Sequence, residues 1–235
     1  YVMPLEHIIK NRGTSMRATQ LLISFILILS ATNTVAEDKV NPNYVFFSSG
    51  DTPDGWHWVI SDPGNWWLPL EGNTGESDKR KVKMEPTTFR NEGDAVKVTW
   101  NKKQIWGSVA ITGRTTDLSK YENSAELSMV VKLHKKPRSL VKISLNCGKD
   151  CNAEFPLTPA LKNAPLNQWF ALPVALNCFS AKGADLSKVQ TPLNIGTDGK
   201  LELSIADVKI LPLKEGEKGC VVTEEEGATK KEQEK

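Results

Sequence analysis

The sequence predicts an all-β protein, a β-sandwich in which only short segments are helical. Apolar and polar residues alternate in several short segments, for example at Val141, Ile143 and Leu145 with polar residues between them. This pattern is typical of a strand with one buried face and one face in water. Turn-forming residues separate the segments, and such a series of short strands favours a β-sandwich.

Six segments are predicted as strands: residues 95–100, 107–112, 125–134, 139–146, 169–176 and 200–211. The Asp198-Gly199 pair fits a tight hairpin that leads into the last of them. Residues 157–166 and 185–187 are candidates for short helical turns, although prolines limit the first.

The predicted sandwich is one domain, residues 44–213, between segments of different composition. An apolar run at residues 21–29 follows Met16 and Arg17 and leads to a small-residue ending at Ala36. We therefore interpret residues 16–36 as a secretory signal peptide, because the run is about half of the roughly 20 residues that a membrane anchor would need. Residues 1–15 are then an upstream extension, residues 37–43 a linker and residues 214–235 a charged, largely disordered tail.

The charge balance excludes one class of partner. Three of the 30 basic residues and one of the 28 acidic residues lie within residues 1–36, so the exported chain is neutral. A neutral chain lacks the concentrated positive field by which proteins bind nucleic acids.

The expected location is the periplasm or the extracellular space, with no membrane span after cleavage of the signal peptide.

Four cysteines predict two disulfides, because an even count in an exported protein is typical of a disulfide framework. Cys147 and Cys151 are near enough to close a small loop, which leaves Cys178 to pair with Cys220. The alternative is a zinc site, but Cys178 and Cys220 are isolated and do not form the close pairs that zinc sites use.

Seven tryptophans are present, and four of them lie between residues 56 and 67. Trp56, Trp58 and Trp100 are assigned to the core, the first two because they alternate on one strand face. Adjacent Trp66 and Trp67 cannot both point inward from an extended segment, so at least one is expected at the surface. Exposed aromatic rings with nearby polar groups are typical of small-ligand sites. The candidate ligand-binding residues are Trp66, Trp67, Trp106, Asp54, Asn65, Arg80 and Asp94.

No catalytic constellation is recognisable in the sequence. The two histidines after residue 36, His57 and His134, lie in no triad or metal-ligand pattern. A glycosidase needs only two facing carboxylates, and the sequence leaves such a pair open among Asp78, Glu85, Glu92, Asp94 and Glu154. Most such residues are ordinary surface groups, so the chain is expected not to be an enzyme.

A family resemblance rests on motifs spread through the predicted domain. They are Gly93-Asp94-Ala95, Trp100, Asp117-Leu118-Ser119, Cys147-Gly148 with Cys151, Trp169, Leu172-Pro173, Cys178-Phe179, residues 183–187 and residues 201–208. In this order they resemble the galactose-binding-like C-terminal domain of bacterial family-3 glycoside hydrolases of the ExoP type, which are exo-β-glucanases and β-glucosidases. The resemblance implies a jelly-roll β-sandwich that binds glycans and does not catalyse their cleavage.

Two functions are therefore expected from the sequence. The first is a secreted carbohydrate-binding accessory module whose ligand is a polysaccharide or oligosaccharide of the β-glucan type. The alternative is a structural domain that docks on a separately encoded glycoside hydrolase of the cell envelope.

No cofactor is expected. A structural calcium ion stays open, since oxygen ligands are abundant but no spaced acidic loop marks a site.

Overall fold

The computed structural model describes residues 44–101 and 104–220. The predicted upstream extension, signal peptide and linker lie outside the described residues, as do residues 221–235 of the predicted tail.

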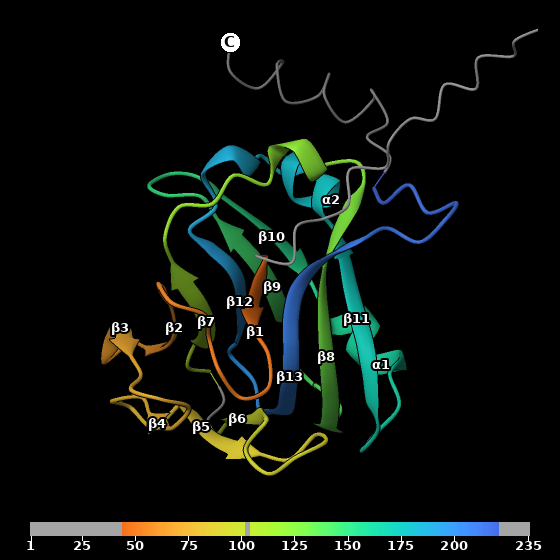
Figure 1. Cartoon of the computed structure of the whole chain (residues 1–235). Helices are drawn as coiled ribbons and strands as arrows, with labels where there is room; N and C mark the ends of the chain where they lie inside the picture. The colour runs from red at the N-terminus through yellow and green to blue at the C-terminus, as the bar shows by residue number, and fades with distance from the viewer. Residues whose placement is uncertain (1–43, 102–103, 221–235) are drawn as a thin grey trace, which may run out of the picture. The chain divides into compact units, whose positions relative to one another are not determined.

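The described strands form two antiparallel sheets (Figure 1). The seven-stranded sheet has the order β11 (Trp169–Ala175), β8 (Ala125–Lys135), β13 (Leu201–Pro212), β6 (Ala95–Trp100), β5 (Val82–Thr87) and β4 (Gly75–Glu76), and β1 (Val45–Phe47) also pairs with β13. The six-stranded sheet has the order β10 (Asn152–Pro156), β9 (Val141–Asn146), β12 (Thr191–Thr197), β7 (Gly107–Gly113), β2 (Trp56–Asp62) and β3 (Asn65–Pro69).

The core consists of the inward side chains of both sheets. Trp58 of β2 and Ile111 of β7 are buried in the same cluster as Met129 of β8 and Leu203 of β13. The predicted β-sandwich is therefore confirmed, and Trp56, Trp58 and Trp100 are core residues as expected.

All six predicted strands are present, with ends that differ by at most two residues. The helical segments are short: α1 (Thr158–Asn163), α2 (Leu176–Ala181), η1 (Ser119–Tyr121) and η2 (Leu186–Lys188). The sequence pattern places Leu176 at the end of a strand, whereas in the structure it begins α2. None of the described helices has the length and apolar character that a membrane span requires.

The predicted hairpin at Asp198-Gly199 is wrong. The bend does connect β12 with β13, but β12 pairs with β7 and β9, whereas β13 pairs with β1, β6 and β8. The chain therefore passes from one sheet to the other at this bend. Tertiary packing decides between a hairpin and such a corner, because the same turn residues serve both.

Lys81 contacts this corner through its side chain. Its side chain is fully buried, and its Nζ donates a hydrogen bond to the carbonyl oxygen of Gly199. Burial lowers the pKa of Lys81 to about 8, although the carboxylate of Asp198 opposes the shift. The lysine of the unfolded chain keeps a pKa of 10.5. Between about pH 8 and pH 10.5 the unfolded chain therefore binds more protons at this site than the folded chain does. The free energy of unfolding consequently rises with pH over this range.

We predict that the free energy of unfolding of the wild type increases relative to that of Lys81→Met as the pH is raised from 8 to 10. Methionine keeps an apolar stem of similar length but has no proton to lose. Urea denaturation of both proteins at matched pH values measures the difference. A difference that stays constant over this range contradicts the expected pKa.

Both predicted disulfides are present, Cys147–Cys151 and Cys178–Cys220, and the described chain contains no free cysteine. The zinc alternative is therefore wrong, because the thiolates that it needs are oxidised. The Cys178–Cys220 bond holds the segment after β13 against α2. Asn177 strengthens this attachment, because its amide donates to the carbonyl oxygen of Lys218 and accepts from the backbone N–H of Cys220.

We predict that the two disulfides differ in what they contribute to stability. They span sequence separations of 42 and 4 residues. In the chain-entropy account, the longer loop contributes roughly 4 kcal/mol and the shorter one roughly 2 kcal/mol. The double substitution Cys178→Ser/Cys220→Ser should therefore lower the melting temperature more than Cys147→Ser/Cys151→Ser does. Equal or inverted losses in calorimetry would show that loop closure is not the main contribution.

Candidate functional site

A groove with a volume of about 540 Å³ lies on the outer face of the six-stranded sheet. Alternation along the strands determines which residues reach it. On β7, Val109 and Ile111 point into the core, so Ser108, Ala110 and Thr112 point outward and line the groove. Val59 and Ser61 of β2 line it for the same reason, since they pair with Ala110 and Ser108 across the sheet.

The floor is hollow because its central side chains are small. Ala110 lies between Val59 of β2 and Asn194 of β12 in the sheet register. In the next row, Ser108 pairs with Gly196, which has no side chain at all. Larger residues at these positions would fill the space above the sheet.

Two tryptophans of β3 line one side of the groove. Trp66 and Trp67 are 59% and 55% exposed, so both adjacent rings are at the surface, whereas the sequence required this of only one. The β2–β3 register shifts between Ile60 and Asp62, and such a bulge redirects neighbouring side chains. The Trp67 ring meets the imidazole of His57 edge to face, with 6.4 Å between the ring centroids.

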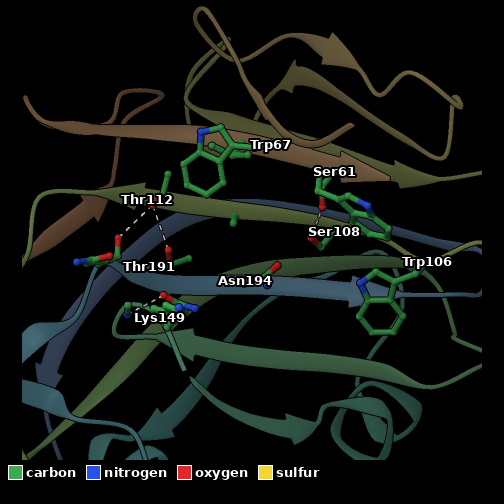
Figure 2. Close-up of a pocket in the computed structure, with 14 residues that line it drawn as sticks. Ser61, Trp67, Trp106, Ser108, Thr112, Lys149, Thr191 and Asn194 are labelled. Carbon is green, nitrogen blue, oxygen red and sulfur yellow. Dashed lines mark hydrogen bonds between the residues drawn. The ribbon is translucent and has the colours of Figure 1, made fainter. Parts of the chain in front are cut away.

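Trp106 lies immediately before β7 and stands at the other end of the floor (Figure 2). Its ring packs against the backbone of Gly196, where an added Cβ would overlap the ring carbons. The Nζ of Lys142 lies 5.9 Å from the ring centroid on the β9 side. The missing side chain of Gly196 is therefore what allows this indole to lie close to the sheet.

The polar groups of the floor are mostly paired with one another. The hydroxyls of Ser61 and Ser108 are 2.7 Å apart, and that of Thr191 donates to Thr112 over 3.1 Å. The exception is the side-chain oxygen of Asn194, which is inaccessible to water and has no hydrogen-bond partner. Figure 2 shows Ser61, Ser108 and Asn194 on the Trp106 side of the Trp67 ring, and Thr112 and Thr191 on its other side.

The Cys147–Cys151 disulfide shapes one end of the groove. It closes the β9–β10 loop, from which Gly148 and Lys149 reach the groove. The Asn146 side chain accepts from the backbone N–H of Gly148 at 3.0 Å, which fixes the start of the loop. The disulfide therefore restrains the loop that forms this end of the groove.

The groove is close to neutral. No residue that lines it within the described ranges carries a carboxylate or an imidazole, and Lys149 is the only charged one. Of the carboxylates named for a hydrolase, Glu85 pairs with Lys83 and Glu154 with Lys142. The described residues also contain no group of three or more histidine, cysteine, aspartate or glutamate side chains that could hold a metal ion.

The structure brings three of the seven candidate binding residues to the groove, namely Trp66, Trp67 and Trp106. Asp54 lies in the turn before β2, and Arg80 forms an exposed ion pair with Glu76 at 3.8 Å. Neither of them lines the groove.

The other two candidates organise the backbone. The side chain of Asn65 accepts from the N–H of Trp67 at 2.9 Å. The carboxylate of Asp94 accepts from the N–H groups of Phe89, Arg90 and Asn91. Burial opposes ionisation of Asp94, but these backbone hydrogen bonds lower its pKa.

Several lining residues were not among the candidates. Ser61, Ser108, Thr112, Thr191 and Asn194 are neutral side chains that are common on any sheet surface. The outward positions of residues 107–112 could have been inferred from alternation. Strand β12 was not predicted, because Pro192 and Gly196 interrupt its apolar pattern.

Solved structures show the same fold. The exo-1,3/1,4-β-glucanase ExoP from a Pseudoalteromonas species has a TM-score of 0.62 and 17% identity over 79% of this chain, which spans only 22% of that enzyme. Its extra C-terminal domain alone has a TM-score of 0.59 and 15% identity, with 77% of this chain and 98% of that one covered. The family 30 carbohydrate-binding module of a Clostridium thermocellum cellulosomal cellulase has a TM-score of 0.51 and 14% identity, with 74% and 98% covered.

No curated protein matches the chain. The Exop_C family, described as galactose-binding domain-like, matches residues 54–210, which is most of the described chain. The jelly-roll sandwich implied by the resemblance agrees with the two sheets. The chain therefore belongs to the Exop_C family of galactose-binding-like domains.

Proposed function

We propose that this domain binds a polysaccharide of the β-glucan type in the groove and has no catalytic activity of its own. The observation that carries the proposal is the combination of exposed tryptophans with a neutral floor of hydroxyl and amide groups. The indole faces can cover the apolar C–H surface of sugar rings, and the floor can form hydrogen bonds with their hydroxyls.

The absence of carboxylates from the groove lining supports binding rather than hydrolysis. Glycoside hydrolysis uses two acidic groups placed on either side of the scissile bond. The lining within the described chain offers none. The proposal of a β-glucan is supported by the structures of similar fold, which include an exo-1,3/1,4-β-glucanase with an extra C-terminal domain and a carbohydrate-binding module of a cellulase.

An exported location fits this function. Two disulfides are typical of proteins in oxidising compartments. Together with the predicted signal peptide they support a periplasmic or extracellular location for the domain.

A second hollow supports the alternative of protein docking. It has a volume of about 530 Å³, lies beside the Cys178–Cys220 disulfide and is lined mainly by apolar side chains, including Phe155, Leu172 and Val174. Such a surface suits a protein partner better than a sugar. It has neither exposed tryptophans nor a polar floor, so glycan binding is assigned to the groove.

Affinity electrophoresis of the purified protein tests the proposal. We expect slower migration in gels that contain laminarin or mixed-linkage glucan than in gels without polysaccharide, and added oligosaccharide should reverse the effect. Xylan serves as a comparison polysaccharide. Unchanged mobility in every gel would reject the glycan proposal and favour docking on a protein.

We predict that Trp67→Ala weakens β-glucan binding by about tenfold or more, because it removes a large aromatic contact surface. Trp66→Ala should act in the same direction. Since both rings are largely exposed, the melting temperature should change little. Leu140→Ala is the matched control, because Leu140 is 46% exposed and lies outside the groove lining. Titration calorimetry measures the affinity. Wild-type affinity in both variants would show that neither tryptophan belongs to the binding site.

We further predict that Gly196→Ala weakens binding through Trp106. The added methyl group overlaps the indole and must displace it from the floor. Trp106→Ala should cause a similar loss, and the double variant should bind no more weakly than either single variant, because both changes remove the same contact. Additive losses would show that Gly196 and Trp106 act independently.

A further inference from the structure

Asn194 lies at the centre of the groove floor. In the sheet register it pairs with Ala110 of β7 on one side and with Ser144 of β9 on the other. Figure 2 shows it between Trp67 and Trp106, so a sugar chain that contacted both rings would pass over it. The amide therefore lies beneath such a chain.

The hydrogen-bonding state of Asn194 differs from that of the rest of the floor. The serine and threonine hydroxyls are already paired, as Ser61 with Ser108 and Thr112 with Thr191. Among the described residues, two buried side-chain atoms have no partner: Nε1 of Trp58, which lies in the core, and Oδ1 of Asn194. An acceptor without a partner and without access to water is unfavourable, and an incoming donor relieves that cost.

A sugar hydroxyl can supply this donor. The terminal torsion of an asparagine side chain is broad, so a modest rotation turns Oδ1 toward the groove. A hydroxyl above Ala110 could then donate to Oδ1 and accept from Nδ2. A carboxylate at the same position has no proton to donate and leaves Oδ1 unpaired, which favours neutral glycans over polyuronates.

Aromatic contact and this hydrogen bond differ in selectivity. Stacking on an indole needs an apolar ring face, which many pyranoses provide. An acceptor that is unpaired in the free protein instead favours only a ligand that places a donor on it, so ligands with and without that donor differ in affinity. We propose that Asn194 is the residue that determines which glycan the groove accepts, and that the preferred ligand is a neutral glycan with a hydroxyl donor directed at the floor. This inference rests on the proposed function.

The test compares selectivity, not only affinity. Dissociation constants are measured by calorimetry for cellohexaose, laminarihexaose, xylohexaose, mannohexaose and an oligogalacturonate. The proteins are the wild type, Asn194→Ala, Trp67→Ala and Ser144→Ala. Ser144 is the matched control, because it lies on the same face beside Asn194 but does not line the groove.

We expect Asn194→Ala to weaken the best-bound neutral hexasaccharide by about tenfold, the effect of one lost hydrogen bond, while the poorly bound sugars change by about twofold or less. The variant should also bind the oligogalacturonate no worse than the wild type does. Trp67→Ala should weaken all neutral sugars by a similar factor, and Ser144→Ala should change none. The melting temperature of Asn194→Ala should not fall, because the substitution removes an unpaired acceptor.

The inference is overturned if Asn194→Ala leaves every affinity unchanged or weakens all sugars by one common factor. In either case Trp67→Ala still reports on the proposed function by itself. A wild type that binds none of the sugars rejects the proposed function, and the inference with it.

Discussion

The burial of apolar side chains between the two sheets is the interaction on which the rest of the molecule depends. In the six-stranded sheet, Ile60, Val109, Ile111 and Ile195 contribute to this core. Because side chains alternate along a strand, fixing these residues inward also fixes their neighbours outward. A slip of one residue in the register would exchange core and groove, so the packing of the core keeps the floor residues in place.

The same alternation frees the outer face for recognition. The positions between the core residues need not be apolar, and they carry serine, alanine, threonine, asparagine and glycine. Small side chains there create the hollow, and neutral polar atoms make it suitable for hydroxyl groups. The groove thus requires no separate scaffold, since it is the second face of a sheet whose first face forms the core.

Tryptophan shows how position determines the role of one residue type. Trp58 and Trp100 are each 1% exposed, whereas Trp66 and Trp67 are more than half exposed. The exposed pair belongs to an edge strand with only one neighbouring strand, and no second sheet covers its rings. Sequence alone separated these groups in part: alternation places Trp56 and Trp58 on one strand face, and the adjacent pair Trp66 and Trp67 required at least one exposed ring, whereas the structure exposes both. The fold and the aromatic part of the site could therefore be predicted from the sequence, because long alternating segments and cysteine spacing are local signals.

Most of the polar part of the site could not be predicted in this way. Asp54, Asn65, Arg80 and Asp94 were chosen for their chemistry and their nearness in sequence, but Asn65 and Asp94 instead satisfy backbone N–H groups, a role that such side chains commonly have in turns. Asn194 was missed because an asparagine in an irregular strand has no distinctive pattern. Only the register, which places it beside Ala110, and the mutual pairing of the nearby hydroxyls leave its oxygen without a partner. A residue of this kind is recognised from the hydrogen bonds that its neighbours have already formed, and those are a property of the folded chain.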